Sequence, residues 1–169
     1  MVILLLMTDM ANVLNDYFCS VFTREDQTNI PDIDTHHGDT YISDITFTRG
    51  AIKRKIMDLK PTSAPGPDQL PVRLLQEFVD EIAPVLATIF TKSLQLGQVP
   101  TEWRLANVTP IHKKGAKGTP GNYRPVSLTS IPGKVMESIM TDHIVKHLEQ
   151  SKLINETQHG FRANKIDHH

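Results

Sequence analysis

The chain has too few cysteines and too few long apolar runs for a disulfide scaffold or a membrane anchor. Cys19 is the only cysteine among its 169 residues, so no disulfide forms within the chain. This suits a reducing, intracellular compartment, without distinguishing cytoplasm from nucleus. Cys19 lies in the apolar run NDYFCSVF, where we expect it to pack against other side chains rather than act as a nucleophile.

The apolar start of the chain, MVILLLM, has neither the length of a membrane span nor the basic flank of a signal peptide. We expect it to begin a buried helix or strand, and we expect no membrane partner.

Acidic side chains are missing between Trp103 and Met136. This stretch carries six basic residues, whereas the other 12 basic and 19 acidic residues of the chain sum to a charge of −7. A cationic segment in an otherwise acidic chain predicts an anionic ligand, and a solvated lysine loop is the equally weighted alternative. The six residues are Arg104, Lys113, Lys114, Lys117, Arg124 and Lys134.

Apolar residues at the helical period predict that most of the chain is helical. The expected helices cover residues 8–22, residues 46 or 48 to about 59, residues 71–96 and residues 131–150. We expect Pro84 to bend or split the third of them and Gly97 to end it. Between the first two lies a polar segment without periodicity, which predicts a linker over residues 23–45.

Two alternating segments, WRLANVTPIH and NYRPVSL, predict a β-hairpin. Each contains a proline, which donates no ladder hydrogen bond and therefore indicates an edge strand. The loop from Lys113 to Gly121 is rich in lysine and glycine. A period of two puts Arg124 on the face of Val126 and Leu128. The predicted fold is therefore α+β and mainly helical, with one β-hairpin.

The hairpin has the residue types that bind a triphosphate. Arginine pairs with two phosphate oxygens through its planar fork, and lysine acts as a point charge. Arg124 sits at the root of the second strand, where the sheet limits its motion, and Lys113 and Lys114 sit at the start of the loop. Glycines let the backbone approach a polyanion closely. The pattern predicts a movable arm that binds phosphate.

Five motifs in this order and spacing resemble the amino-terminal part of reverse transcriptases of non-LTR, LINE- or jockey-like retrotransposons. They are SAPGPDQLP, WRLANVTPIHKKG, GNYRPVSLTS, KVMESIM and QHGFR. The run ANVLNDYFCSVFT also resembles the segment that precedes that domain, so the likeness covers roughly residues 9–162. It implies a helical segment over residues 1–22, the linker over 23–45, a partial reverse transcriptase domain over 46–162 and a frayed tail over 163–169.

The resemblance implies that the hairpin is the fingers arm of a right-hand polymerase whose palm is truncated in this chain. Arg124 would bind the triphosphate of a deoxynucleotide, and Lys113 and Lys114 would lie beside it, as further substrate-binding residues, or on the template backbone. The implied partners are an RNA template and a DNA primer. The residues implied to contact the nucleic acid are Lys117, Gly160, Phe161 and Arg162.

The chain departs from the family pattern at several points. Gln69 stands where the family usually has glycine, and Pro132 replaces the common residue of its motif. The family holds two divalent metal ions, such as Mg²⁺, through palm aspartates that include an adjacent pair, and this chain contains no Asp-Asp pair. We therefore assign no catalytic residue and no metal ligand, and we expect these residues alone not to polymerise DNA.

Three functions stay open from the sequence. The chain is a remnant that binds nucleic acid or nucleotide weakly, a repurposed helical module that binds a protein, or one segment of a working polymerase. Without the palm, apolar helix residues such as Leu74, Phe78 and Ile139 are expected to be exposed.

Two residue types invite other roles. His143 and His147 have the i, i+4 spacing of a zinc site but no third ligand, so we favour solvated histidines. Trp103 has the ring to stack on a base, but beside a short apolar strand we favour a core anchor.

Overall fold

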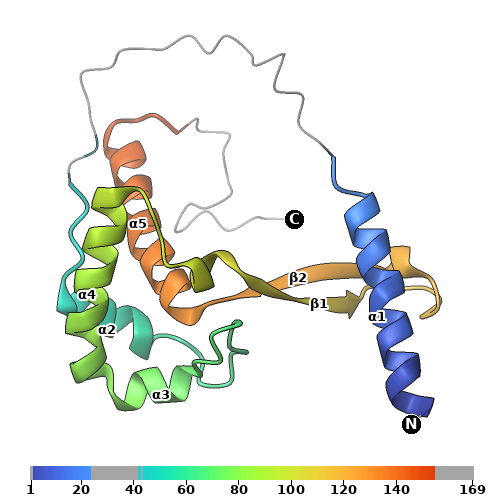
Figure 1. Cartoon of the computed structure of the whole chain (residues 1–169). Coiled ribbons are helices and arrows are strands. Elements are labelled where there is room, and N and C mark those ends of the chain that lie inside the picture. Colours follow the sequence, from blue (N-terminus) through green and yellow to red (C-terminus); the bar gives the residue numbers. More distant parts are fainter. Residues whose placement is uncertain (1, 24–41, 43, 155–169) are drawn as a thin grey trace.

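The computed structural model describes residues 2–23, 42 and 44–154. Its helices are α1 (Val2–Ser20), α2 (Arg49–Met57), α3 (Val72–Glu77), α4 (Val79–Leu96) and α5 (Ile131–Gln150), with 3-10 turns η1 (Thr101–Arg104) and η2 (Pro120–Asn122). Strands β1 (Ala106–His112) and β2 (Tyr123–Thr129) form an antiparallel pair. Helices α2 to α5 gather into one body, the hairpin projects from it, and α1 lies at the hairpin's far end (Figure 1). The mainly helical fold with one hairpin is confirmed.

The core lies among α2, α4 and α5, and Phe90 of α4 is at its centre. Its side chain is fully buried and makes edge-to-face contacts with Phe47 and Trp103, at ring-centroid distances of 5.4 and 5.7 Å. Trp103 is therefore a core anchor, as expected. The buried cluster comprises Phe47, Ile52, Ile56, Val72, Leu75, Val79, Ala83, Leu86, Phe90, Ile131, Val135, Met136 and Ile139.

Helix α2 begins directly after Thr48, one of the two predicted starts, and ends at Met57, two residues before the predicted end. The Thr48 hydroxyl accepts a hydrogen bond from the Ala51 N–H at 3.1 Å and so caps the first turn. Ile52 and Ile56 are completely buried one turn apart. At the other end, the Gln76 amide donates to the carbonyls of Ile56 and Leu59 at 3.1 and 3.0 Å, which joins α3 to the end of α2.

The predicted split of the third helix occurs at a different residue. The chain breaks at Phe78 (φ −106°, ψ 30°), whereas α4 runs through Pro84 without interruption. Inside a helix, proline removes one backbone hydrogen bond and presses its ring on the carbonyl four residues earlier. The burial of Leu86 and Phe90, which follow Pro84 in α4, outweighs this cost. Gly97 ends α4 in the left-handed conformation, as predicted.

Helix α1 begins at Val2 rather than near residue 8, and it buries a narrower stripe than its sequence predicts. Over residues 9–20, the part of the helix whose side chains are described, Leu14 and Phe18 are the buried residues, whereas Met10 and Val13 are each 54% exposed. Cys19 is also exposed, so its expected packing is wrong. The reason is that α1 lies against a two-stranded hairpin and not against the helical body (Figure 1). The narrow hairpin covers one row of side chains, that of Leu14 and Phe18, which are one turn apart.

The expected exposure of apolar helix residues is right for two of the three named. Leu74 and Phe78 are 41% and 49% exposed. Ile139 is buried, because α2 packs directly on α5 and covers it. Nearer the end of α5, Ile144 is exposed although it continues the helical spacing of the buried Val135, Met136 and Ile139.

The PGPDQ turn before α3 packs backbone against backbone. A Cβ atom on Gly66 would lie 2.5 Å from the Ser130 nitrogen and 2.6 Å from the Thr129 carbonyl carbon, at the junction of β2 and α5. Within the described residues, Asp68 Oδ2 in this turn is buried without a hydrogen-bond partner. Gln69 has a φ of +56°, in the left-handed region that favours glycine. The family's usual glycine thus has a physical reason, and Gln69 is strained.

We predict that Gln69→Gly raises the free energy of unfolding by about 0.5–1 kcal/mol, because glycine adopts positive φ without a steric cost. The substitution gives up a hydrogen bond of 3.3 Å from the Gln69 amide to the Gly66 carbonyl, which offsets part of the gain. Urea denaturation of the two proteins measures the difference. Gln69→Ala is the matched control, since it removes the same hydrogen bond but keeps the strain. A glycine variant no more stable than the alanine variant would refute the strain.

Candidate nucleic-acid interface

The hairpin register explains how both strands tolerate a proline. The strands pair from Ala106↔Thr129 to His112↔Tyr123, and Pro110 lies opposite Pro125. One step beyond, the Lys113 N–H donates to the Asn122 carbonyl at 2.7 Å, which marks a hydrogen-bonded pair. Hydrogen-bonded and non-bonded pairs alternate along an antiparallel ladder, so the two prolines meet at a non-bonded pair, where neither needs an N–H.

The same register separates the two faces of the hairpin. Arg124 lies opposite Ile111, and the alternation puts it on the face of Val126 and Leu128, as predicted. The other face carries Val108 and Pro110, which line a hollow of about 310 Å³ together with residues of α1. Helix α1 therefore covers the face opposite Arg124 and leaves the arginine's own face free of it.

The loop between the strands is closed by side chains that bond to its own backbone. The Asn122 amide donates to the Ala116 carbonyl at 2.8 Å, and the Tyr123 hydroxyl donates to the Lys117 carbonyl at 2.9 Å. His112 Nε2 lies 3.1 Å from the Gly115 carbonyl oxygen, and its ring packs edge-to-face on Tyr123 at 5.2 Å. The loop is therefore folded, a feature that its lysine- and glycine-rich sequence did not predict.

Gly115 allows the loop between the strands to close on its own backbone. Its φ of +84° lies in the left-handed region, and a Cβ atom there would come within 2.7 Å of the Asn122 amide nitrogen. Any other residue would press on the side chain that closes the loop. Gly115 thus has a structural role in the turn, in addition to the close approach of the backbone to a polyanion that the sequence predicts.

The hairpin cations project into solvent. Lys113, Lys114, Lys117 and Arg124 are all exposed. Ion pairs in the described part of the chain join Lys53 to Asp80 and Lys55 to Asp142, and neither involves the hairpin. No described carboxylate lies within salt-bridge distance of these hairpin cations, so none of the described acidic residues competes there with an anionic ligand.

The remaining candidate site residues are the template-contacting residues near the end of the chain and the two histidines of α5. Gly160, Phe161 and Arg162 lie outside the described residues. Over residues 2–23, 42 and 44–154, no three side chains of His, Cys, Asp or Glu come together as a metal site would require, and this includes His143 and His147. Of the helices in the described ranges, none is long and apolar enough to cross a membrane.

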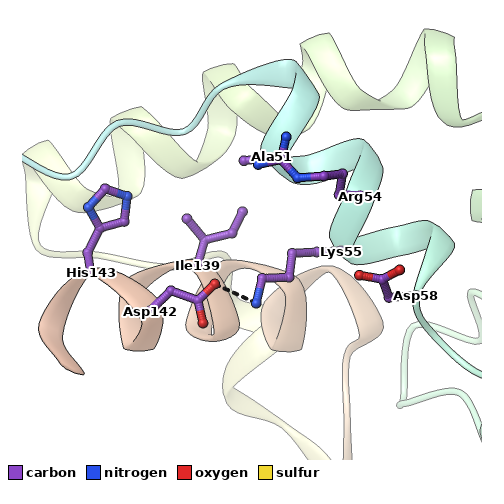
Figure 2. Close-up of a pocket in the computed structure, with 7 residues that line it drawn as sticks. All are labelled: Ala51, Arg54, Lys55, Asp58, Ile139, Asp142 and His143. Atoms are coloured by element: carbon purple, nitrogen blue, oxygen red, sulfur yellow. Dashed lines mark ion pairs between the residues drawn. The ribbon is translucent and has the colours of Figure 1, made fainter. Parts of the chain in front are cut away.

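A second hollow of about 310 Å³ lies between α2 and α5 (Figure 2). Lys55 Nζ and Asp142 Oδ2 form an ion pair of 2.6 Å across it. Arg54 and Asp58 add one charge of each sign, so the lining has no excess charge that would select an ionic ligand. This hollow is therefore a gap between two packed helices that a salt bridge spans, and we assign no ligand to it.

The sequence is similar to polymerases of mobile elements. It is 35% identical over 112 residues to the RNA-directed DNA polymerase from mobile element jockey of Drosophila melanogaster, and 32% identical over 112 residues to that of Drosophila funebris. Each match covers 66% of this chain and 12% of the relative. The Pol polyprotein from type-1 retrotransposable element R1 of Bradysia coprophila is 29% identical over 93 residues, which are 54% of this chain and 9% of the relative. No protein-family model matches.

The chain thus spans about an eighth of the length of these jockey relatives. Over about two thirds of its own length, it is related to the RNA-directed DNA polymerases of non-LTR retrotransposons of the jockey type.

Proposed function

We propose that this chain is the fingers segment of a retrotransposon RNA-directed DNA polymerase, and that its hairpin binds phosphate. Arg124, Lys113 and Lys114 bind the triphosphate of the incoming deoxynucleotide. Lys117 contacts the backbone of the RNA template, together with Gly160, Phe161 and Arg162. Residues 46–162 form the partial polymerase domain, and residues 1–22 and 23–45 are the helical segment and linker before it.

The single observation that carries this proposal is the set of exposed cations on the hairpin, none of which forms an ion pair with a described carboxylate. Arg124 is anchored in a paired strand, with Ile111 opposite, so its guanidinium starts from a fixed backbone. The folded loop restrains the backbone that carries the lysines. Fixed donors bind a polyanion with a smaller loss of conformational freedom than donors on an open loop.

Nucleotide transfer needs divalent metal ions between the primer hydroxyl and the phosphates. The 169 residues supply cations for the phosphates but contain no adjacent aspartates of the kind that holds these ions in the family. This segment by itself therefore binds substrate without joining nucleotides.

The test is the affinity of the chain for an RNA–DNA duplex, measured by fluorescence anisotropy at several salt concentrations. Binding through phosphates makes log K fall linearly with log salt, with a slope of about −0.9 for each phosphate neutralised. We expect Lys113→Ala/Lys114→Ala/Arg124→Ala to weaken binding more than tenfold at about 0.1 M salt and to reduce the slope by roughly two to three.

The control is Lys60→Ala/Lys92→Ala/Lys146→Ala, which removes the same charge from exposed positions outside the hairpin. An equal loss of affinity in both triple variants would mean that net charge, not the hairpin, binds the duplex. A wild-type chain without salt-dependent binding would instead favour a protein-interaction module.

A further inference from the structure

Helix α1 and the hairpin form a packing unit apart from the main core. Leu14 and Phe18 are only 6% and 8% exposed, yet neither belongs to the buried cluster of α2 to α5. The two residues lie one turn apart on one side of the helix. Figure 1 shows α1 beside the outer end of the hairpin, away from the helical body. The hairpin is therefore what buries them.

The contacts reach both a strand and the turn. Leu14 and Phe18 line one hollow together with Val108 and Pro110 of β1. At the turn, the Tyr17 hydroxyl oxygen lies only 3.0 Å from the position that a Cβ atom on Gly121 would take. Helix α1 thus crosses the hairpin from the middle of β1 to η2.

Each of the two elements needs the other. A two-stranded hairpin that packs on nothing is marginally stable in water, and packing against a helix is one of the ways to stabilise it. Most of the stability of a helix in a protein comes from packing of its apolar face, and the hairpin provides that packing for Leu14 and Phe18 of α1. Since α1 uses the Val108 face, it stabilises the arm and leaves the face of Arg124 open.

We infer that α1 is a brace for the cationic hairpin, and that Leu14 and Phe18 are positioning residues. They hold the two strands in the register that carries Arg124, and they touch no ligand themselves. Their effect on ligand affinity rests on the proposed function of the hairpin. Their effect on the hairpin's own stability does not.

The first test is hydrogen exchange of the full chain, followed by mass spectrometry. In Leu14→Ala/Phe18→Ala, we expect the amides of β1 and β2 to exchange about tenfold faster or more, while those of α2, α4 and α5 keep their rates. Leu14→Met/Phe18→Leu retains apolar packing and should keep the slow exchange. Met10→Ala/Val13→Ala removes two half-exposed side chains of the same helix and serves as the matched control.

Unchanged exchange in the hairpin of Leu14→Ala/Phe18→Ala would overturn the brace. Equal acceleration in α2, α4 and α5 would overturn it too, since α1 would then support the whole fold and not the arm.

The second test is duplex affinity. We expect it to fall about fivefold in Leu14→Ala/Phe18→Ala and to stay unchanged in Met10→Ala/Val13→Ala. Faster exchange with unchanged affinity would refute the positioning role, provided that the triple hairpin variant does lose affinity. If the wild-type chain binds no duplex at all, the proposed function fails. The exchange measurement alone then tests whether α1 stabilises the hairpin.

Discussion

Gly66→Ala is expected to destabilise the chain by about 3 kcal/mol, at the upper end of what overpacking costs. The new methyl group would lie 2.5 Å from the Ser130 nitrogen and 2.7 Å from the Thr129 carbonyl oxygen. Both are backbone atoms, so no side-chain rotation relieves the clash. The PGPDQ turn must then move away from the junction of β2 and α5, which is also where the hairpin leaves the helical body.

Urea denaturation followed by circular dichroism measures this loss as a lower midpoint. Gly118→Ala is the matched control, because a Cβ atom at Gly118 has no neighbour within 4 Å. We expect that control to stay within about 0.5 kcal/mol of the wild type. A Gly66 variant as stable as the Gly118 variant would mean that the turn does not pack as closely as described.

Phe90→Ala is expected to cost about 3–5 kcal/mol, the range for truncating a buried aromatic side chain. Phe90 is fully buried and contacts the rings of Phe47, before α2, and Trp103, in η1. The cavity that the substitution leaves therefore removes contacts among α4, η1 and the segment before α2. Domains of this size are stable by only about 5–15 kcal/mol, so the loss is a large fraction of the total.

The same urea titration measures the Phe90 variant. Leu96→Ala is its control on the same helix, since Leu96 is 70% exposed and should change stability by less than about 0.5 kcal/mol. Similar midpoints for the two variants would show that Phe90 is not the centre of the core.

Local patterns in the sequence predicted much of the fold. Ile52 and Ile56 lie at helical spacing behind a capping Thr48, and Gly97 follows the last apolar residue of α4. The alternation around Arg124 predicted the face on which it lies. All of these features depend on residues within one or two turns of each other, which is the range that periodicity describes.

The features that the sequence did not predict depend on distant partners. Gly66 packs on Ser130, 64 positions later, and Ile139 is covered by α2. The apolar stripe of α1 is wider than the hairpin it meets, so Met10 stays exposed. Such contacts follow from how elements pack, and no local period encodes that.

The features of the hairpin site also fall into those that the sequence predicts and those that it does not. Exposed cations without described ion-pair partners follow from the absence of acidic residues in the segment. The closure of the loop by Asn122 and Tyr123 does not, because each side chain reaches back six positions to a backbone carbonyl, outside any helical or strand period. The proline inside each of the two alternating segments did indicate edge strands correctly, since the described sheet has two strands.

Hydrogen exchange of the wild-type chain with and without a saturating RNA–DNA duplex tests the role of the hairpin most directly. Phosphate binding by Arg124 and the loop lysines predicts slower exchange over residues 111–124, with α4 unchanged. Slower exchange confined to the exposed apolar residues around Leu74 and Phe78, with the hairpin unaffected, would contradict it.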